Sequence, residues 1–474
     1  MRVSHCWLVL IFLACPLCAE EPAIPAAPKP SREQTVTLRW YQSVWDGAYH
    51  KVGRRNVRWD SPVDSATFLI AEGLAEVPAA EPRWRELAVE LADAALREGC
   101  DDPMVRFAAR RFRPAAGRVE RRSAEVAADW VAIAEALSAS GYPPNLKFHA
   151  EMEAAAALRS AMPSGTNTWP DIHRHRHAAM NLLLSALADK TTPTIEVTEM
   201  VMSERRMVRS NPKQLAASWA QIEPLLRRNW PRLPLADLID GQLAIEAAWK
   251  ARGSGTIDTV TESGYRKFTE ELEKADQLLT RAWEQDKSNP VAPTKMLTVC
   301  LGLQKDGGEM EKWFQRAMEA RPGYFPALRA KLEFLTPKWG GSVNALRSFG
   351  RQCLKEPTWG DEAPLIVIDV HRAIAAAHAW QMPPAEAVAV RAGYWRGPGV
   401  WDEVREALDE VHRRRPNDVE DHNSKRATWS LRCGAWDEFL RVAPALSPAA
   451  QKRLAGTNTF EGLVAEVRSR AGGK

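Results

Sequence analysis

Apolar residues recur three and four positions apart along most of the chain, in segments of about twelve to twenty residues. Charged residues fill the intervening positions. One clear stripe consists of Trp84, Leu87, Ala88, Leu91, Ala94 and Ala95. We find no convincing alternation of period two, which a half-buried strand requires. The pattern therefore predicts an all-α protein with no sheet of any size.

A polar residue followed by proline recurs where the apolar periodicity begins. The polar side chain can accept from free backbone N–H groups, and proline suits the first helical position. The occurrences are Ser61-Pro62, Asp102-Pro103, Thr192-Pro193, Asn211-Pro212 and Ser447-Pro448, and Gln214 would complete a capping box with Asn211. These starts predict short helices joined by brief turns, which is typical of antiparallel helix pairs.

The second half contains a weak internal repeat. The segment 281–284 followed by Ala292 matches the segment 316–319 followed by Ala327, at an offset of thirty-five residues. Tetratricopeptide repeats have a period of about thirty-four residues. They place a small alanine on the second helix and a proline five residues later, a spacing that Ala317 and Pro322 keep. Ala282 is followed by Lys287 where proline belongs, and Val411 with Pro416 forms a degraded third copy.

Residues of roughly 263 to 440 therefore resemble the tetratricopeptide-repeat superfamily. Within them, the runs Trp313-Phe314-Gln315-Arg316-Ala317, Phe325-Pro326-Ala327 and Thr336-Pro337-Lys338-Trp339-Gly340-Gly341-Ser342 also resemble an uncharacterised bacterial exported family with a recurring Pro-x-Trp-Gly-Gly-Ser turn. The resemblance implies an α-solenoid of antiparallel helix hairpins. It implies no activity.

The Gly-Gly-Ser turn also has a physical interpretation of its own. Gly340 and Gly341 supply backbone freedom at a helix end, Ser342 can cap the following helix, and Trp339 would pack over the junction. The alternative, a loop that cradles an anion, lacks the Lys and Ser/Thr that follow the glycines of a phosphate-binding loop. We therefore expect a structural turn.

The first nineteen residues have the layout of a secretory signal peptide. Arg2 and His5 precede the apolar run 7–14, and Leu17-Cys18-Ala19 ends in a small residue. An alternative interpretation of Phe12-Leu13-Ala14-Cys15 is a lipoprotein box with lipid attached at Cys15. We expect a signal peptide over 1–19, a Pro/Ala-rich tether over 20–34, a divergent helical domain over 35–252 and tetratricopeptide-like repeats over 253–474. No other stretch is long and apolar enough to span a membrane.

Composition narrows the function classes. Lys and Arg number 64 against 60 Asp and Glu. This small excess does not predict nucleic-acid binding, which usually shows a strongly basic face. Metalloprotease, nucleophile-elbow and dinucleotide-binding motifs are missing, so we expect no catalytic, cofactor or metal residues.

Three patterns were considered as candidate sites. His173 and His177 share a helix face at metal-ligand spacing, although Arg174 and Arg176 between them oppose a cation. A dense arginine run could bind an acidic partner, although nearby acids can pair with it; it consists of Arg106, Arg110, Arg111, Arg113, Arg118, Arg121 and Arg122, and Arg413-Arg414-Arg415 is a second run. The tryptophans expected to be exposed, and so able to stack on a sugar, are Trp339, Trp359, Trp395 and Trp401.

Four cysteines lie beyond the leader: Cys100, Cys300, Cys353 and Cys433. Export would permit disulfides, but the scattered positions favour small buried apolar residues on helices. The leading functional hypothesis is an exported, periplasmic or extracellular scaffold protein that holds a protein or peptide in a concave helical groove. The alternative is a carbohydrate-binding or hydrolytic helical enzyme that uses exposed tryptophans.

Overall fold

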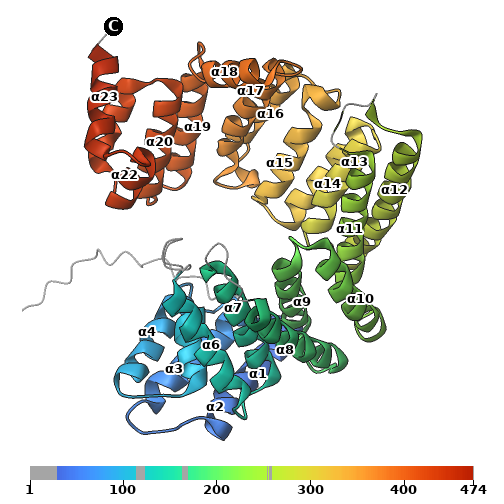
Figure 1. Ribbon diagram of the computed structural model, residues 1–474, viewed down its shortest axis with the longest axis vertical. Coiled ribbons are helices and arrows are strands. Elements are labelled where there is room, and N and C mark those ends of the chain that lie inside the picture. The colour runs from blue at the N-terminus through green and yellow to red at the C-terminus, as the bar shows by residue number, and fades with distance from the viewer. Residues whose placement is uncertain (1–28, 114–122, 163–168, 254, 256–258, 473–474) are drawn as a thin grey trace, which may run out of the picture. The chain divides into compact units, whose positions relative to one another are not determined.

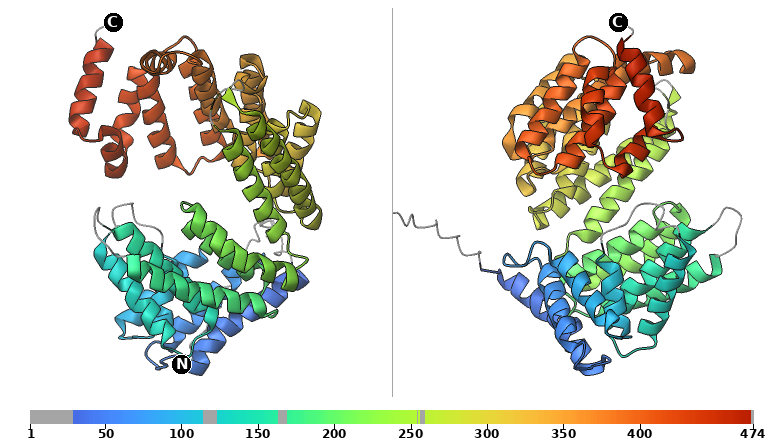
Figure 2. Two further views of the ribbon diagram at one scale, coloured as in Figure 1. Left: turned by 45° about the vertical axis from the view of Figure 1, so that its right-hand side comes forward. Right: turned by 90° about the vertical axis from the view of Figure 1, so that its left-hand side faces the viewer.

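The computed structural model describes residues 29–472 except 114–122, 163–168, 254 and 256–258. Every regular element in these ranges is a helix, and no strand occurs in them (Figures 1 and 2). The all-α prediction is therefore confirmed for this part of the chain. No helix among these residues is long and apolar enough to cross a membrane. The signal-peptide and lipid-anchor expectations fall in 1–28, outside the described residues.

The chain divides into two compact units, Met1–Asn229 and Trp230–Lys474. In unit 1, helices α1 to α7 surround one hydrophobic core that includes Tyr49, Phe107 and Leu137. The helices of unit 1 are α1 (Arg32–Val44), α2 (Asp46–Val52), α3 (Asp60–Leu74), α4 (Trp84–Arg97), α5 (Pro103–Arg111), α6 (Ala124–Ser138), α7 (Pro144–Ala161), α8 (Trp169–Ala188), α9 (Thr194–Val208) and α10 (Pro212–Asn229).

In unit 2, most consecutive helices pack on each other. In the alternating set α11, α13, α15 and α17, each helix but the last also packs on the next. The helices are α11 (Leu235–Arg252), α12 (Glu262–Gln285), α13 (Val291–Gly302), α14 (Gly307–Ala320), α15 (Phe325–Phe334), α16 (Val343–Lys355), α17 (Ile366–His378), α18 (Pro384–Tyr394), α19 (Val400–Arg414), α20 (Val419–Cys433), α21 (Trp436–Val442), α22 (Pro448–Ala455) and α23 (Phe460–Gly472). Four 3-10 turns join them: η3 (Pro337–Trp339), η4 (Pro357–Trp359), η5 (Ala363–Leu365) and η6 (Ala443–Ala445).

The expected domain boundary at 252/253 lies inside unit 2. The helix α11 before it packs along α12 after it, so the two helices belong to one core. Gly253 follows α11 as its C-cap with a φ of 76°, a backbone conformation that L side chains rarely adopt. The first helix, α1, begins at Arg32, inside the expected tether, because Ser31 and Gln34 form a capping box.

Three of the predicted helix starts are confirmed. The Asp102 carboxylate accepts from the N–H of Met104 at 2.8 Å, Ser447 accepts from Ala450, and Asn211 accepts from Gln214. The other two predictions are wrong in detail. Helix α3 begins at Asp60, which places Ser61 inside the helix, and α9 begins at Thr194 after an uncapped Pro193.

The Gly-Gly-Ser turn has its predicted structural role. Gly340 is left-handed, with a φ of 89°, and the Ser342 hydroxyl accepts from the N–H of Ala345 at 3.0 Å to start α16. The Trp339 ring packs edge-on against Trp249 of α11, with centroids 5.5 Å apart. The turn thus links α15, α16 and α11.

Alanine substitutions at the two glycines should lower the free energy of unfolding by different amounts. A Cβ on Gly341 would lie 2.0 Å from the backbone oxygen of Leu335, whereas one on Gly340 would meet nothing within 4 Å. We expect Gly340→Ala to cost about 1 kcal/mol, the left-handed penalty alone. Gly341→Ala should cost about 2 to 3 kcal/mol, because backbone must move. Urea unfolding of both variants measures the difference, and equal costs would contradict this turn geometry.

Candidate functional site

Three arginines lie on three different helices of unit 2. Arg329 belongs to α15, Arg372 to α17 and Arg432 to α20, and all three are exposed. We call this set the arginine strip. It contains neither of the arginine runs singled out in the sequence.

Asp369 of α17 organises one end of the strip. Its Oδ2 accepts from Arg329 Nε at 2.9 Å, and its Oδ1 accepts from Arg372 Nη1. The Asp369 side chain is 13% exposed, whereas those of Arg329 and Arg372 are 60% and 52% exposed. One shielded carboxylate therefore orients two cations that remain open to solvent.

Tryptophans support the other end of the strip. The guanidinium carbon of Arg372 lies 5.1 Å from the ring centroid of Trp429, and that of Arg432 lies 5.0 Å from Trp395 and 5.7 Å from Trp429. The two rings are 4.9 Å apart and buried. Cation–π contacts of this kind hold arginine side chains flat against a rigid surface. With three arginines and one aspartate, the strip carries a net charge of plus two.

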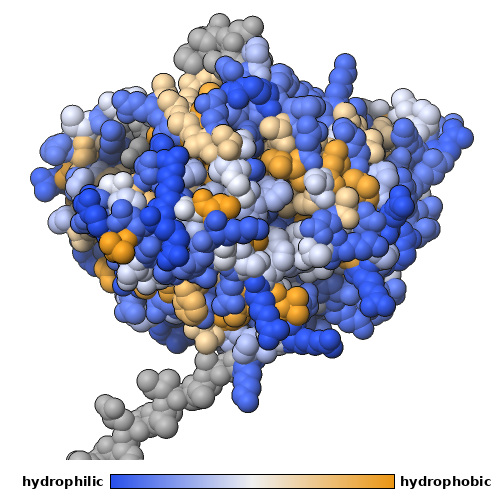
Figure 3. Space-filling view, turned by 90° about the horizontal axis from the view of Figure 1, so that it is seen from below, coloured by the Kyte–Doolittle hydropathy of each residue, from blue (hydrophilic) through white to orange (hydrophobic). Residues whose placement is uncertain are grey.

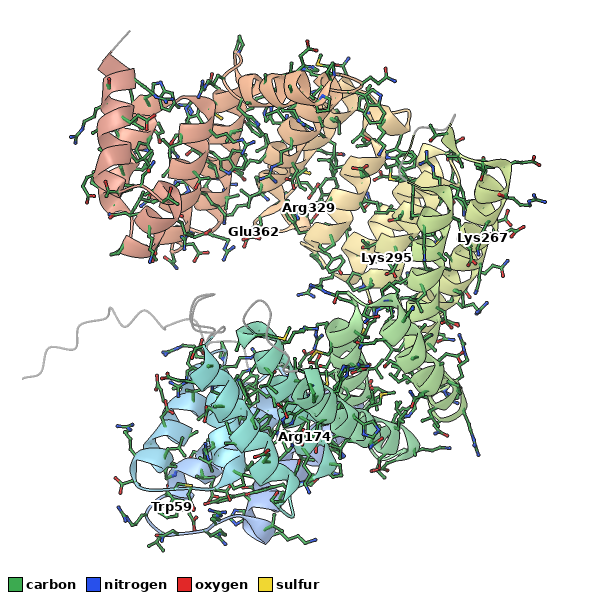
Figure 4. All side chains as sticks on the ribbon, in the orientation of Figure 1. Trp59, Arg174, Lys267, Lys295, Arg329 and Glu362 are labelled. Atoms are coloured by element: carbon green, nitrogen blue, oxygen red, sulfur yellow. The ribbon has the colours of Figure 1, made fainter. Side chains whose placement is uncertain are left out.

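Figure 4 labels Arg329 together with Lys295 of α13 and Glu362 before η5. Lys295 is half-buried on the helix that precedes α15 in the alternating set. Glu362 is paired with Arg415 at 2.6 Å, so this carboxylate already has a partner.

The expected exposure of four tryptophans is wrong for two of them. Trp395 is 2% and Trp359 is 7% exposed, because each fills volume between helices beside other aromatic rings. Trp339 and Trp401 are half-buried. A tryptophan near a glycine or proline turn can thus still point into the core.

In the histidine run on α8, the buried histidine is not one of the two that the sequence analysis considered as metal ligands. His173 and His177 are exposed, while His175 between them is fully buried. His175 Nδ1 lies 2.6 Å from Glu151 Oε2, and Ser138 donates to the other oxygen of Glu151 at 2.6 Å. The stripe of Ile172, His175, Ala179 and Leu183 was the signal that could have identified it.

A second buried histidine–carboxylate pair joins α7 to α9. His149 Nε2 lies 2.9 Å from Glu196 Oε1, and the Tyr41 hydroxyl donates to Glu196 Oε2 at 2.8 Å. Burial alone would raise the pKa of Glu196, but the charge and hydrogen bond of His149 and the bond from Tyr41 outweigh it, so this pKa is lowered. Since Glu196 is 3% exposed, we assign the pair to stability.

The first arginine run is largely paired within unit 1. Arg106 and Arg110 both contact Asp129, Arg111 donates to Glu153 at 2.8 Å, and Arg113 donates to Asp93. The rest of the run lies in 114–122, outside the described residues. In the second run, Arg413 and Arg414 share Glu410, and Arg414 also donates to the carbonyls of Gly360 and Leu354. Ordinary pairing therefore occupies the described arginines of both runs.

The four cysteines are buried and unpaired. Burial raises the pKa of the Cys300 and Cys353 thiols to about 12 and that of Cys433 to about 11. Such thiols stay protonated and unreactive at neutral pH. This matches the expectation that they act as small apolar residues.

Figure 3 shows one face of the molecule, on which hydrophobic residues appear in small separate groups among hydrophilic ones. Over the described part of the chain, one cluster of three metal-ligating groups is found, formed by Asp46, His50 and Asp64. His173 and His177 do not belong to it. Comparison with known protein families finds no model that matches this chain, and comparison with curated proteins finds no related sequence.

The Glu196 pair predicts an acid-sensitive contribution to stability. Glu196→Ala should cost about 3 to 5 kcal/mol at neutral pH, because His149 and Tyr41 lose their buried partner. Because the folded pKa of Glu196 is lowered, its contribution is complete above the unfolded value of 4.5 and is lost as the pH falls toward the folded value. Chemical denaturation of wild type and variant between pH 7 and about pH 3 measures both effects.

Glu199→Ala on the same helix is the matched control. Glu199 is 42% exposed and pairs with exposed Arg206, so its loss should cost less than about 1 kcal/mol. Similar losses for the two variants would show that Glu196 is not buried as described.

Two histidines stack where α19 meets α20. The rings of His412 and His422 lie 4.3 Å apart at 26° in a small pocket also lined by Asp421 and Lys425. Burial lowers the pKa of His422, and His412, Arg426 and Arg441 lower it further against the opposing effect of Asp409. The neutral form of His422 is therefore the one that the fold accommodates.

We expect the melting temperature of the protein to fall as the pH drops below 6.5. The unfolded chain then binds a proton that the folded His422, with its lower pKa, does not yet bind. His422→Gln should reduce this decline between pH 6.5 and about pH 5, which calorimetry at a series of pH values can measure. If the melting temperature of the variant falls over this pH range as much as that of wild type, other titratable groups cause the fall.

Proposed function

We propose that this chain is a binding module of the tetratricopeptide-like class whose unit 2 receives an acidic segment of a partner protein along the arginine strip. The observation that carries the proposal is the strip itself, in which three exposed arginines are ordered by one shielded aspartate and two buried tryptophans. Ordering before binding reduces the entropy that a ligand must overcome.

The packing of unit 2 supports a stack of antiparallel helix hairpins. The helices α11, α13, α15 and α17 contact one another in turn, as the first helices of successive pairs do in a solenoid. Ala282 and Ala317, the repeat positions that should be small, are 2% and 0% exposed. The helices that carry them, α12 and α14, both end in an extended residue whose N–H bonds back to that alanine's carbonyl.

The chemistry of the strip supports a carboxylate-bearing partner. Arginine presents several donors in a plane that matches a carboxylate. Arg329 uses its Nε for Asp369, which leaves both Nη groups for a ligand, and Arg372 uses one Nη. A segment with two or more Asp or Glu residues would neutralise the excess charge.

The site of action proposed from the sequence is the cell envelope or the exterior. It follows from the leader pattern in 1–19, with Cys15 as the alternative lipid attachment point. The carbohydrate hypothesis loses part of its basis, because the buried Trp359 and Trp395 cannot stack on a sugar. We therefore favour a protein partner.

The test reverses charge on the strip. Arg329→Glu combined with Arg372→Glu should weaken capture of the partner at least about tenfold, since two attractive charges become repulsive. Partners are identified by crosslinking the tagged chain in cells and by mass spectrometry, and the affinity is then measured with the purified partner. Wild-type affinity should also fall as salt rises from about 50 to 300 mM.

Lys267→Glu provides the control, because Lys267 is an exposed cation on α12, a helix that carries none of the arginines of the strip (Figure 4). This variant should keep wild-type affinity. If it loses as much affinity as the double variant, net charge and not the strip governs binding. If a partner binds the double variant as tightly as wild type, the strip is not the binding surface.

A further inference from the structure

Asp46, His50 and Asp64 bring three ligand atoms together in unit 1. His50 Nε2 lies 3.4 Å from Asp46 Oδ1 and 3.3 Å from Asp64 Oδ1, and all three atoms lie within 4.8 Å of one another. Asp46 and His50 are one turn apart on α2, and Asp64 is on α3. Trp59, labelled in Figure 4, is the N-cap residue of α3.

A protonated histidine shared by two carboxylates explains these contacts poorly. A hydrogen bond from N–H to oxygen measures about 2.7 to 3.2 Å, and an Nε2 hydrogen that is shared between two acceptors makes a weaker bond to each. Both contacts are longer than this range. Asp64 Oδ1 is moreover a buried atom that has no hydrogen-bond partner among the described residues. A buried carboxylate oxygen without a donor needs another source of positive charge.

A divalent cation fits the same geometry. In a tetrahedral site with bonds of about 2.0 to 2.2 Å, neighbouring ligand atoms lie roughly 3.3 to 3.5 Å apart. The measured separations of 3.4 and 3.3 Å agree with that spacing. One imidazole and two carboxylates form a borderline donor set that suits Zn²⁺ or Co²⁺ better than the all-oxygen preference of Mg²⁺ or Ca²⁺. The side chains of His50, Asp46 and Asp64 are 39%, 43% and 39% exposed, which leaves room for a water ligand.

The surrounding residues fix the two helices and leave the site negative. The Tyr49 hydroxyl of α2 donates to Asp60 Oδ1 of α3 at 2.8 Å, and Arg55 pairs with the other oxygen of Asp60 at 3.4 Å. Arg55 and Asp60 thus cancel in charge, while Asp46 and Asp64 carry two negative charges. A bound dication would neutralise the pair.

We propose that Asp46, His50 and Asp64 form a binding site for one Zn²⁺-class divalent cation, with water completing the coordination. This site lies in unit 1, and it does not depend on the function proposed for unit 2.

The test measures Zn²⁺ binding to the full chain after treatment with a chelator. Isothermal titration and equilibrium dialysis should give one tightly bound Zn²⁺ per chain, and Co²⁺ should give visible absorption bands of a low-coordinate nitrogen–oxygen site. His50→Ala should abolish the binding of this Zn²⁺. Asp64→Asn, which keeps the side-chain shape, should weaken it about tenfold or more. Circular dichroism of the metal-free variants checks that they fold.

His177→Ala is the matched control, because His177 is an exposed helical histidine of the same unit. It should bind Zn²⁺ as wild type does. Wild type that binds no Zn²⁺, or binds it no more tightly than His50→Ala, would overturn the proposal. Loss of binding in His177→Ala with binding kept in His50→Ala would place the metal on α8 and overturn it as well.

Discussion

The close approach of short helices at small residues is the constraint on which the rest of the structure depends. The helices contain 7 to 24 residues, and helices of this length are marginal in water unless they pack. In unit 2 the approach is tight. A Cβ on Gly241 would lie 2.7 Å from Leu279 Cγ, and one on Gly302 would lie 2.4 Å from Leu272 Cδ1. In the same way, the packing of α15 on α17 sets the spacing of Arg329 and Arg372, which are far apart in sequence.

The two units bury polar groups in different ways. Unit 1 encloses carboxylates that are matched with histidine or arginine, including Glu151, Glu196 and Glu204. Removing one partner of such a pair is costly, because the other is left buried without its counter-charge, so the pairs penalise any packing that separates them. In unit 2 the buried Lys331 pairs with Glu311 and lies 4.1 Å from the Phe314 ring. Both arrangements determine which helix faces pack together. Apolar contacts alone would specify this packing less narrowly.

The sequence predicted much of the fold because its signals were local. Asp102 and Ser447 each precede a proline at a helix start, and a cap depends on residues within one turn. The predicted helix start at Ser61 is wrong because the turn Asn56–Trp59 starts the helix earlier. The N–H of Asp60 donates to the carbonyl of Asn56. The predicted exposure of Trp395 is wrong for another reason. Its burial depends on Trp429, which is 34 residues away on α20.

The candidate sites were hidden because they depend on contacts across helices. Arg329 and Asp369 are forty residues apart, and nothing in either local segment distinguishes them from other surface charges. Asp46 and His50 are at helical spacing, but the third ligand becomes evident only when α3 is placed beside α2. His173 and His177 illustrate the converse, since they have a ligand-like spacing on one helix but do not belong to the three-residue cluster. Helical spacing brings two side chains together, and a site that needs three groups requires tertiary packing to supply the third.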